Sequence, residues 1–274
     1  MIYQRLFTSL VGIPILFAAI WLGSFWFFSI LSVCAAIAIV EFQRMTSKGT
    51  RRAPWFLGIF WTISFLIVGQ YSVGLTQFLI ISLVTFIIGM FLTALWVLIF
   101  CDRSTIYPTW LMTSLGPIYV GFCLSHALAL RHLWADDSLG RNWILFCIIL
   151  IFASDTGGYL VGRLMGKHPF APILSPSKTW EGTIAGFILV IIAAIFLNGI
   201  LLSGIIYWQV LLISATVGIT APTGDLFESK LKRIYGLKDT GAILPGHGGM
   251  LDRLDSTLLT IPFVYYFAFT IVHY

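Results

Sequence analysis

The stretch TQFLIISLVTFIIGMFLTALWVLI, residues 76–99, contains no charged side chain and is long enough to cross a bilayer as one helix. Apolar runs of roughly 17 residues or more recur along the whole chain, whereas a membrane β-barrel would alternate apolar and polar positions. Of the 274 residues, 59% are hydrophobic and only 10% are charged, against about 25% charged in soluble domains. The sequence therefore predicts an all-α integral membrane protein, a polytopic helical bundle.

Turns and charged segments divide this sequence into about nine predicted transmembrane helices. They cover residues 6–22, 25–42, 54–69, 76–99, 110–130, 143–163, 182–202, 207–222 and 256–273. With the N-terminus in the cytoplasm, only Arg131 and Arg141 of the 16 lysines and arginines fall on the far side, as the positive-inside rule requires. We therefore expect a cytoplasmic N-terminus and a location in the cytoplasmic (inner) membrane.

Polar residues are distributed unevenly along the chain. Residues 1–140 hold few polar side chains inside their spans and are predicted to form a transmembrane scaffold. Residues 141–274 hold nearly every polar cluster and are predicted to form the catalytic region, with loops 163–181 and 222–255 on the cytoplasmic face. The net charge of +5 at pH 7 is explained by this orientation, so no nucleic acid is expected as a partner.

The segment FASDTGGYLVGRLMGKHPFAP, residues 152–172, places one carboxylate in an otherwise apolar span. A charge at the centre of a span costs roughly 3 kcal/mol or more. We therefore assign Asp155 to function, with a buried structural hydrogen bond as the alternative. Gly158, Gly162 and Gly166 recur every four residues, which favours close helix packing rather than a role in the site.

The segment LSPSKTWEGT, residues 174–183, leads into the next predicted span through two polar turns. Lys178 comes from a turn rich in Ser and Thr at a helix N-terminus, where phosphate groups bind readily. An ordinary interfacial lysine is an equally good interpretation of this motif alone.

The segment APTGDLFESKLKRIYGLKDTG, residues 221–241, is predicted to break a span at Pro222 and Gly224 and to continue as a short amphipathic helix ended by Gly236. Four polar residues share one face of that helix: Asp225, Glu228, Ser229 and Lys232. Carboxylates followed by a cation suit a metal ion with a phosphate beside it. A solvated helix lying on the membrane is the structural alternative, and it explains Asp225 poorly because that residue lies at the membrane boundary.

The segment GAILPGHGGMLDRLDS, residues 241–256, concentrates flexible and polar residues in an apolar chain. Its glycines, among them Gly248 and Gly249, allow the backbone to approach a ligand and to donate N–H groups to it. His247 lies in the same turn and can donate a hydrogen bond or a proton.

The end of this segment adds charges at helical spacing. Asp252 and Asp255 share one face as the last predicted span begins, and Arg253 can hold a phosphate as a bidentate fork. Hard carboxylate oxygens near a glycine-rich turn and several cations indicate a magnesium–phosphate site.

These residues carry a resemblance to a known family. The run S-K-L-K-R-x4-K-D-x-G-x3-P-G-H-G-G-x-L-D-R-x-D, from Ser229 to Asp255, resembles the signature of the phosphatidate cytidylyltransferases, also called CDP-diacylglycerol synthases. The upstream segments SDTGGY, GRLMGKH, SPSKTWEG and GDLFES match the same family in order. The resemblance covers roughly residues 150–256, and the N-terminal half is similar only in its hydropathy.

The resemblance implies a reaction between CTP and phosphatidic acid that gives CDP-diacylglycerol and pyrophosphate for phospholipid biosynthesis. It implies an enzyme that requires Mg²⁺, allows a second cation, spans the lipid bilayer and works as a homodimer. A phosphate oxygen of phosphatidic acid would attack the α-phosphorus of CTP, which needs positioning and charge neutralisation but no covalent nucleophile.

On this basis each candidate residue receives an expected role. Metal binding is assigned to Asp225 and Asp252. The catalytic set adds Lys232, Arg233, His247 and Arg253 to these two. Substrate binding is assigned to Lys178, Lys238, Ser229, Gly248, Gly249, Asp155 and Asp255, the two aspartates also being the second choices as metal ligands.

Three other classes of protein remain as alternatives. An intramembrane aspartyl protease would pair Asp155 with Asp225, but it gives no reason for the His-Gly-Gly turn or the nearby cations. A transporter would also place Asp in a span, but its halves should show pseudo-symmetry. A kinase that uses CTP on a membrane alcohol is chemically closest, and it would release CDP instead of pyrophosphate.

Overall fold

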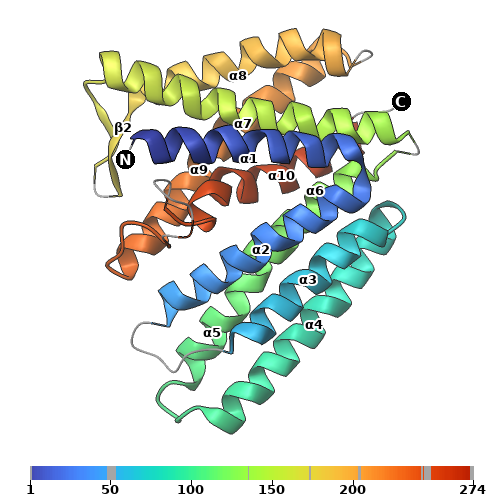
Figure 1. Cartoon of the computed structure of the whole chain (residues 1–274), viewed down its shortest axis with the longest axis vertical. Coiled ribbons are helices and arrows are strands. Elements are labelled where there is room, and N and C mark those ends of the chain that lie inside the picture. The colour runs from blue at the N-terminus through green and yellow to red at the C-terminus, as the bar shows by residue number, and fades with distance from the viewer. Residues whose placement is uncertain are drawn as a thin grey trace. The chain divides into compact units, whose positions relative to one another are not determined.

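The computed structural model describes residues 2–47, 54–134, 136–172, 174–202, 205–241, 243 and 248–271. Most of these residues are helical, which confirms the predicted all-α polytopic bundle (Figure 1). Six helices in the described part of the chain are long and apolar enough to cross a membrane: α2 (Ser24–Thr46), α4 (Gly74–Phe100), the continuous helix Ile106–Arg131, α7 (Asp137–Met165), α8 (Trp180–Leu201) and α9 (Tyr207–Ile234). The remaining helices are α1 (Ile2–Leu22), α3 (Trp55–Tyr71) and α10 (Leu251–Ile271). Nine spans and a cytoplasmic N-terminus stay predictions.

The chain forms two compact units. The first consists of Met1–His132 with Tyr235–Asp252, and the second of Leu133–Ile234 with Arg253–Tyr274. The predicted division at residue 140 was drawn from polarity and stays a prediction. Within the predicted loop 222–255, residues 235–252 belong to the first unit, and residues 222–234 and 253–255 belong to the second.

In the first unit, α3 packs against α2, α4 and the helix Ile106–Arg131 (Figure 1). That helix consists of α5 (Ile106–Pro117), a π-helical turn (η1, Ile118–Phe122) and α6 (Cys123–Arg131). The wide turn follows Pro117, which has no N–H to continue the α-helical hydrogen bonds. Phe42, Phe65 and Leu124 are fully buried and form part of the core of this unit.

In the second unit, α7 and α8 lie side by side (Figure 1) and touch through glycines. A Cβ atom added at Gly182 would lie 2.5 Å from the carbonyl oxygen of Gly158 and 3.0 Å from the Cα of Gly162. A Cβ at Gly157 would lie 2.9 Å from the Cα of Gly186. The predicted packing role of Gly158 and Gly162 is therefore confirmed.

The connection between α7 and α8 contains a short antiparallel hairpin, β1 (Pro169–Ala171) and β2 (Ser175–Thr179). The turns predicted for residues 174–183 are thus replaced by a strand, and Lys178 lies on β2. Thr179 caps α8, because its side chain accepts a hydrogen bond from the N–H of Gly182 (3.2 Å).

The predicted break at Pro222 and Gly224 is wrong, because α9 continues through both to Ile234. Local rules favour a break at proline, but packing on both sides holds this helix. A Cβ at Gly218 would lie 2.6 Å from the ring of Phe187 on α8, and one at Gly224 would lie 2.6 Å from the carbonyl oxygen of Asp255 on α10. Gly236 then adopts a φ of +65°, and the predicted helix end there is confirmed.

The last helix, α10, begins at Leu251 rather than at residue 256. Asp252 lies in its first turn. A carboxylate there is stabilised by the free N–H groups and the positive end of the helix dipole. The earlier start places Asp252, Arg253 and Asp255 on one continuous helix.

Candidate active site

In the second unit three aspartates from three helices come together: Asp155 on α7, Asp225 on α9 and Asp255 on α10. The Asp255 carboxylate interacts electrostatically with those of Asp225 and Asp155, and the last two interact with each other. We call these residues the acidic cluster. Its formation follows from the close approach of α9 and α10 at Gly224, one residue before Asp225.

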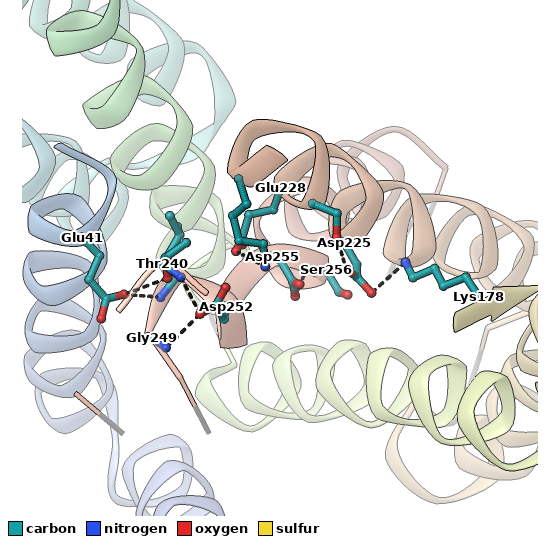
Figure 2. A network of polar contacts seen from close by, with 12 residues as sticks. Glu41, Lys178, Asp225, Glu228, Thr240, Gly249, Asp252, Asp255 and Ser256 are labelled. Atoms are coloured by element: carbon teal, nitrogen blue, oxygen red, sulfur yellow. Dashed lines mark hydrogen bonds and ion pairs between the residues drawn. The ribbon is translucent and has the colours of Figure 1, made fainter. Parts of the chain in front are cut away.

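A lysine holds one carboxylate of this cluster. Lys178 Nζ lies 2.7 Å from Asp225 Oδ2 and donates to the carbonyl oxygen of Pro222 (3.3 Å) (Figure 2). The Ser229 hydroxyl donates to Asp225 Oδ1 (3.3 Å). The Lys178 and Asp225 side chains are 20% and 33% exposed, so both can be reached by a ligand.

Two further cations act on the acidic cluster. Arg253 interacts electrostatically with Asp155, and Lys232 with Asp255. Lys232 also pairs with Glu228, with 3.2 Å between Nζ and Oε1. The face predicted from the sequence is therefore confirmed by contacts within α9, although Glu228 was not among the predicted site residues.

Asp252, the other predicted metal ligand, lies in the first unit. Its Oδ2 accepts hydrogen bonds from the backbone N–H groups of Gly249 (2.8 Å) and Thr240 (3.0 Å) (Figure 2). Glu41 on α2 lies in the same unit, and its Oε2 accepts from the N–H of Leu251 (2.9 Å). Glu41 was not among the predicted site residues, although a carboxylate inside the predicted span 25–42 was a usable signal.

The other predicted residues are placed as follows. Arg233 is exposed at the end of α9, and Lys238 is exposed in the segment that follows. Gly248 has a φ of +84°, a conformation that glycine adopts freely. Gly249 is buried and uses its N–H on Asp252. His247 lies outside the described residues.

The donor set of the acidic cluster suits Mg²⁺ chemically. Among the described residues no three His, Cys, Asp or Glu side chains are close enough together to hold a metal ion by themselves. Mg²⁺, however, is usually bound through one or two carboxylates plus the phosphates of a substrate. Carboxylate oxygens from α9 and α10 beside cations fit that mode of binding.

Carboxylates that can hold a metal ion, beside cations that can neutralise phosphate oxygens, are typical of phosphoryl-transfer sites. Residues 3–271 match the sequence profile of the cytidylyltransferase family. The chain is 31% identical to the phosphatidate cytidylyltransferase of Bacillus subtilis over 267 residues, 96% of each chain. It is 40% identical to that of Staphylococcus saprophyticus over 145 residues (52% of this chain, 56% of the relative), and 45% identical to that of Mycobacterium bovis over 119 residues (43% and 39%). The chain therefore belongs to the cytidylyltransferase family, and as a member it is an enzyme, a nucleotidyltransferase.

Proposed function

We propose that this enzyme transfers CMP from CTP to phosphatidic acid, giving CDP-diacylglycerol and pyrophosphate for phospholipid biosynthesis. The acidic cluster with its surrounding cations supports the proposal, because a nucleoside triphosphate with its metal ion requires both carboxylates and cations. The names of the relatives support the same reaction.

The cations bind and orient the two anionic substrates. Lys178, Lys232 and Arg253 neutralise phosphate oxygens, so that a phosphatidate oxygen can approach the α-phosphorus of CTP. The bond from that oxygen to the α-phosphorus forms while the bond to the pyrophosphate oxygen breaks. Arg233 is assigned to the departing pyrophosphate, Lys238 stays a predicted substrate-binding residue, and no side chain has to form a covalent intermediate.

Mg²⁺ would be held by Asp225 and Asp255 of the acidic cluster, and Asp252 stays a predicted ligand. When bound, the ion neutralises developing charge on the phosphate oxygens. Asp155 adds negative charge that favours a cation in this region, and a second cation remains part of the proposal.

The proposed orientation places the N-terminus and the acidic cluster at the cytoplasmic face of the inner membrane. The distribution of Lys and Arg along the sequence supports it. Phosphatidic acid would then enter sideways from the bilayer. A homodimer is proposed from the family resemblance, and cross-linking of the purified protein tests it.

The test uses the purified full-length protein in detergent with phosphatidic acid, labelled CTP and Mg²⁺. Wild type should release pyrophosphate and form a CDP-lipid in equal amounts. Asp225→Asn and Asp255→Asn should lower kcat roughly 100-fold or more, whereas Asp102→Asn, at an exposed carboxylate elsewhere, should keep the wild-type rate.

Two outcomes count against the proposal. Release of CDP in place of pyrophosphate would identify a kinase, and folded wild type without a CDP-lipid would remove the reaction. Full activity in folded Asp225→Asn and Asp255→Asn would keep the reaction but remove the acidic cluster from it.

A further inference from the structure

Glu41 is a buried carboxylate on a helix of the first unit, and its side chain is only 1% exposed. Its Oε2 accepts hydrogen bonds from the backbone N–H of Leu251 (2.9 Å) and from the hydroxyl of Thr240 (3.4 Å) (Figure 2). Thr240 immediately precedes and Leu251 immediately follows residues 241–250, which we call the glycine-rich segment. Through these two hydrogen bonds Glu41 connects Thr240 to the first residue of α10.

Two glycines make this approach possible. A Cβ atom added at Gly241 would collide with Glu41 Oε1 and lie 2.8 Å from its Cδ. A Cβ at Gly249 would collide with Thr240 Oγ1 and lie 2.6 Å from Glu41 Oε2. Glycine at these two positions thus serves a contact inside the protein.

Asp252 completes the arrangement from the other side. It accepts the backbone N–H groups of Thr240 and Gly249, while Glu41 accepts the Thr240 hydroxyl and the Leu251 N–H. We call Glu41, Thr240, Gly249, Leu251 and Asp252 the loop anchor. It fixes the backbone immediately before and at the start of α10.

The carboxylate of Glu41 is costly at this position. Its Oε1 is buried and has no hydrogen-bond partner among the residues that the structure describes. Burying a polar oxygen without a partner is unfavourable, and an apolar side chain would fill the same space at a lower cost. The cost points to a role that an apolar side chain would not perform.

We propose that Glu41 is a positioning residue for the reaction, acting through the first turn of α10. That turn contains Asp252 and Arg253, and an error of about 1 Å in such groups can lower a rate roughly 100-fold. The inference rests on the proposed function. Glu41 is not proposed to touch a substrate.

The kinetic test compares Glu41→Ala and Glu41→Gln with wild type. The alanine variant should lower kcat roughly 100-fold with little change in KM. The glutamine variant keeps an acceptor oxygen for the Leu251 N–H and should recover part of that loss. Thr46→Val is the matched control, because Thr46 is buried on the same helix and its hydroxyl donates to the Phe42 carbonyl of that helix.

Hydrogen exchange of the full-length protein gives a readout that does not depend on activity. Amide exchange at Leu251 should be faster in Glu41→Ala and unchanged in Thr46→Val. Thr240→Val removes one donor to Glu41 with little change in shape, and like Glu41→Ala it should lower kcat. If Glu41→Ala does not fold, Glu41→Gln and Thr240→Val are measured in its place.

Three results would overturn the inference or separate it from the reaction. Faster exchange with normal kcat would make the loop anchor structural only. Unchanged exchange in both Glu41 variants would remove the anchor. An inactive wild type would instead overturn the proposed function, because that failure appears before any change at Glu41.

Discussion

Lys178 on β2 and Asp225 on α9 form an ion pair, with 2.7 Å between Nζ and Oδ2, and the same ammonium group donates to the carbonyl oxygen of Pro222. The two side chains are only partly buried, so water screens the pair and it contributes little to stability. The contact to the helix backbone matters more, because it fixes the position of the lysine beside the acidic cluster. In the proposed function, Lys178 would therefore already be in place for a phosphate group of CTP.

Replacement of Lys178 should impair catalysis far more than folding. In Lys178→Met, kcat/KM for CTP should fall roughly 100-fold, because one preorganised charge is lost, while thermal unfolding changes little. Lys178→Arg should recover only part of the activity, since a planar guanidinium does not reproduce a point charge. Lys167→Met, at an exposed lysine of the same loop, is the control. Normal kinetics in Lys178→Met would contradict the assigned role.

The glycine contact between α7 and α8 should be sensitive to a single methyl group. In Gly182→Ala the new Cβ would lie 2.5 Å from the Gly158 carbonyl oxygen, which should destabilise the protein by roughly 1–3 kcal/mol. Gly199→Ala lies on the same helix with nothing within 4 Å of the added Cβ, and it should be neutral or stabilising. Thermal unfolding in detergent compares the two, and equal melting temperatures would refute the close contact.

The Glu228–Lys232 pair allows a test of buried charge. The Glu228 side chain is fully buried and that of Lys232 is 12% exposed. Glu228→Ala leaves the lysine without this partner and should cost about 3 kcal/mol or more, whereas Glu228→Gln combined with Lys232→Met should cost less than the single change. Chemical denaturation of Glu228→Ala, Glu228→Gln, Lys232→Met and the double variant measures this. A double variant as unstable as the sum of Glu228→Gln and Lys232→Met would argue against the pair.

The start of α7 should respond to acid. Hydrogen bonds from the side chain and the backbone N–H of Ser138 hold the pKa of Asp136 below its ordinary value of 3.8. Because the folded pKa is the lower one, the stabilising effect of this helix cap is fully present above 3.8 and is lost as the pH falls through the folded pKa. Amide exchange at Ser138, corrected for its intrinsic pH dependence, should therefore rise in wild type as the pH falls below 3.8. Asp136→Asn, which caps without titrating, should not show this rise, and the same rise in both would exclude the carboxylate as its cause.

The helices of this fold could be predicted because each needs only a long apolar run. The continuity of α9 could not, since the local rule for Pro222 was overridden by packing against Phe187 and Asp255, which lie far away in the sequence. The hairpin that carries Lys178 was not predicted either, because a short polar segment that contains Pro176 is typical of turns.

The acidic cluster could be anticipated because a carboxylate such as Asp155 or Asp225 is costly in or beside a span and so indicates function. Glu41 gave the same signal, but its meaning depends on Thr240 and Leu251, 199 and 210 positions away. Sequence periodicity places Asp252 and Asp255 on one helix face, yet only the fold reveals that Asp252 holds the backbone of Thr240 and Gly249.

The glycine contact between α7 and α8 has different consequences for substitutions at the contact and for substitutions on the outer faces of the two helices. Because backbone touches backbone at Gly157, Gly182 and Gly186, the spacing between these helices does not depend on the bulk of their other side chains. Residues on the outer faces of the pair, such as Leu160 and Ile188, are exposed and take no part in this contact. The outer surface is thus free to adapt to bilayers of different thickness or lipid content, while Asp155 and Lys178 keep the same separation.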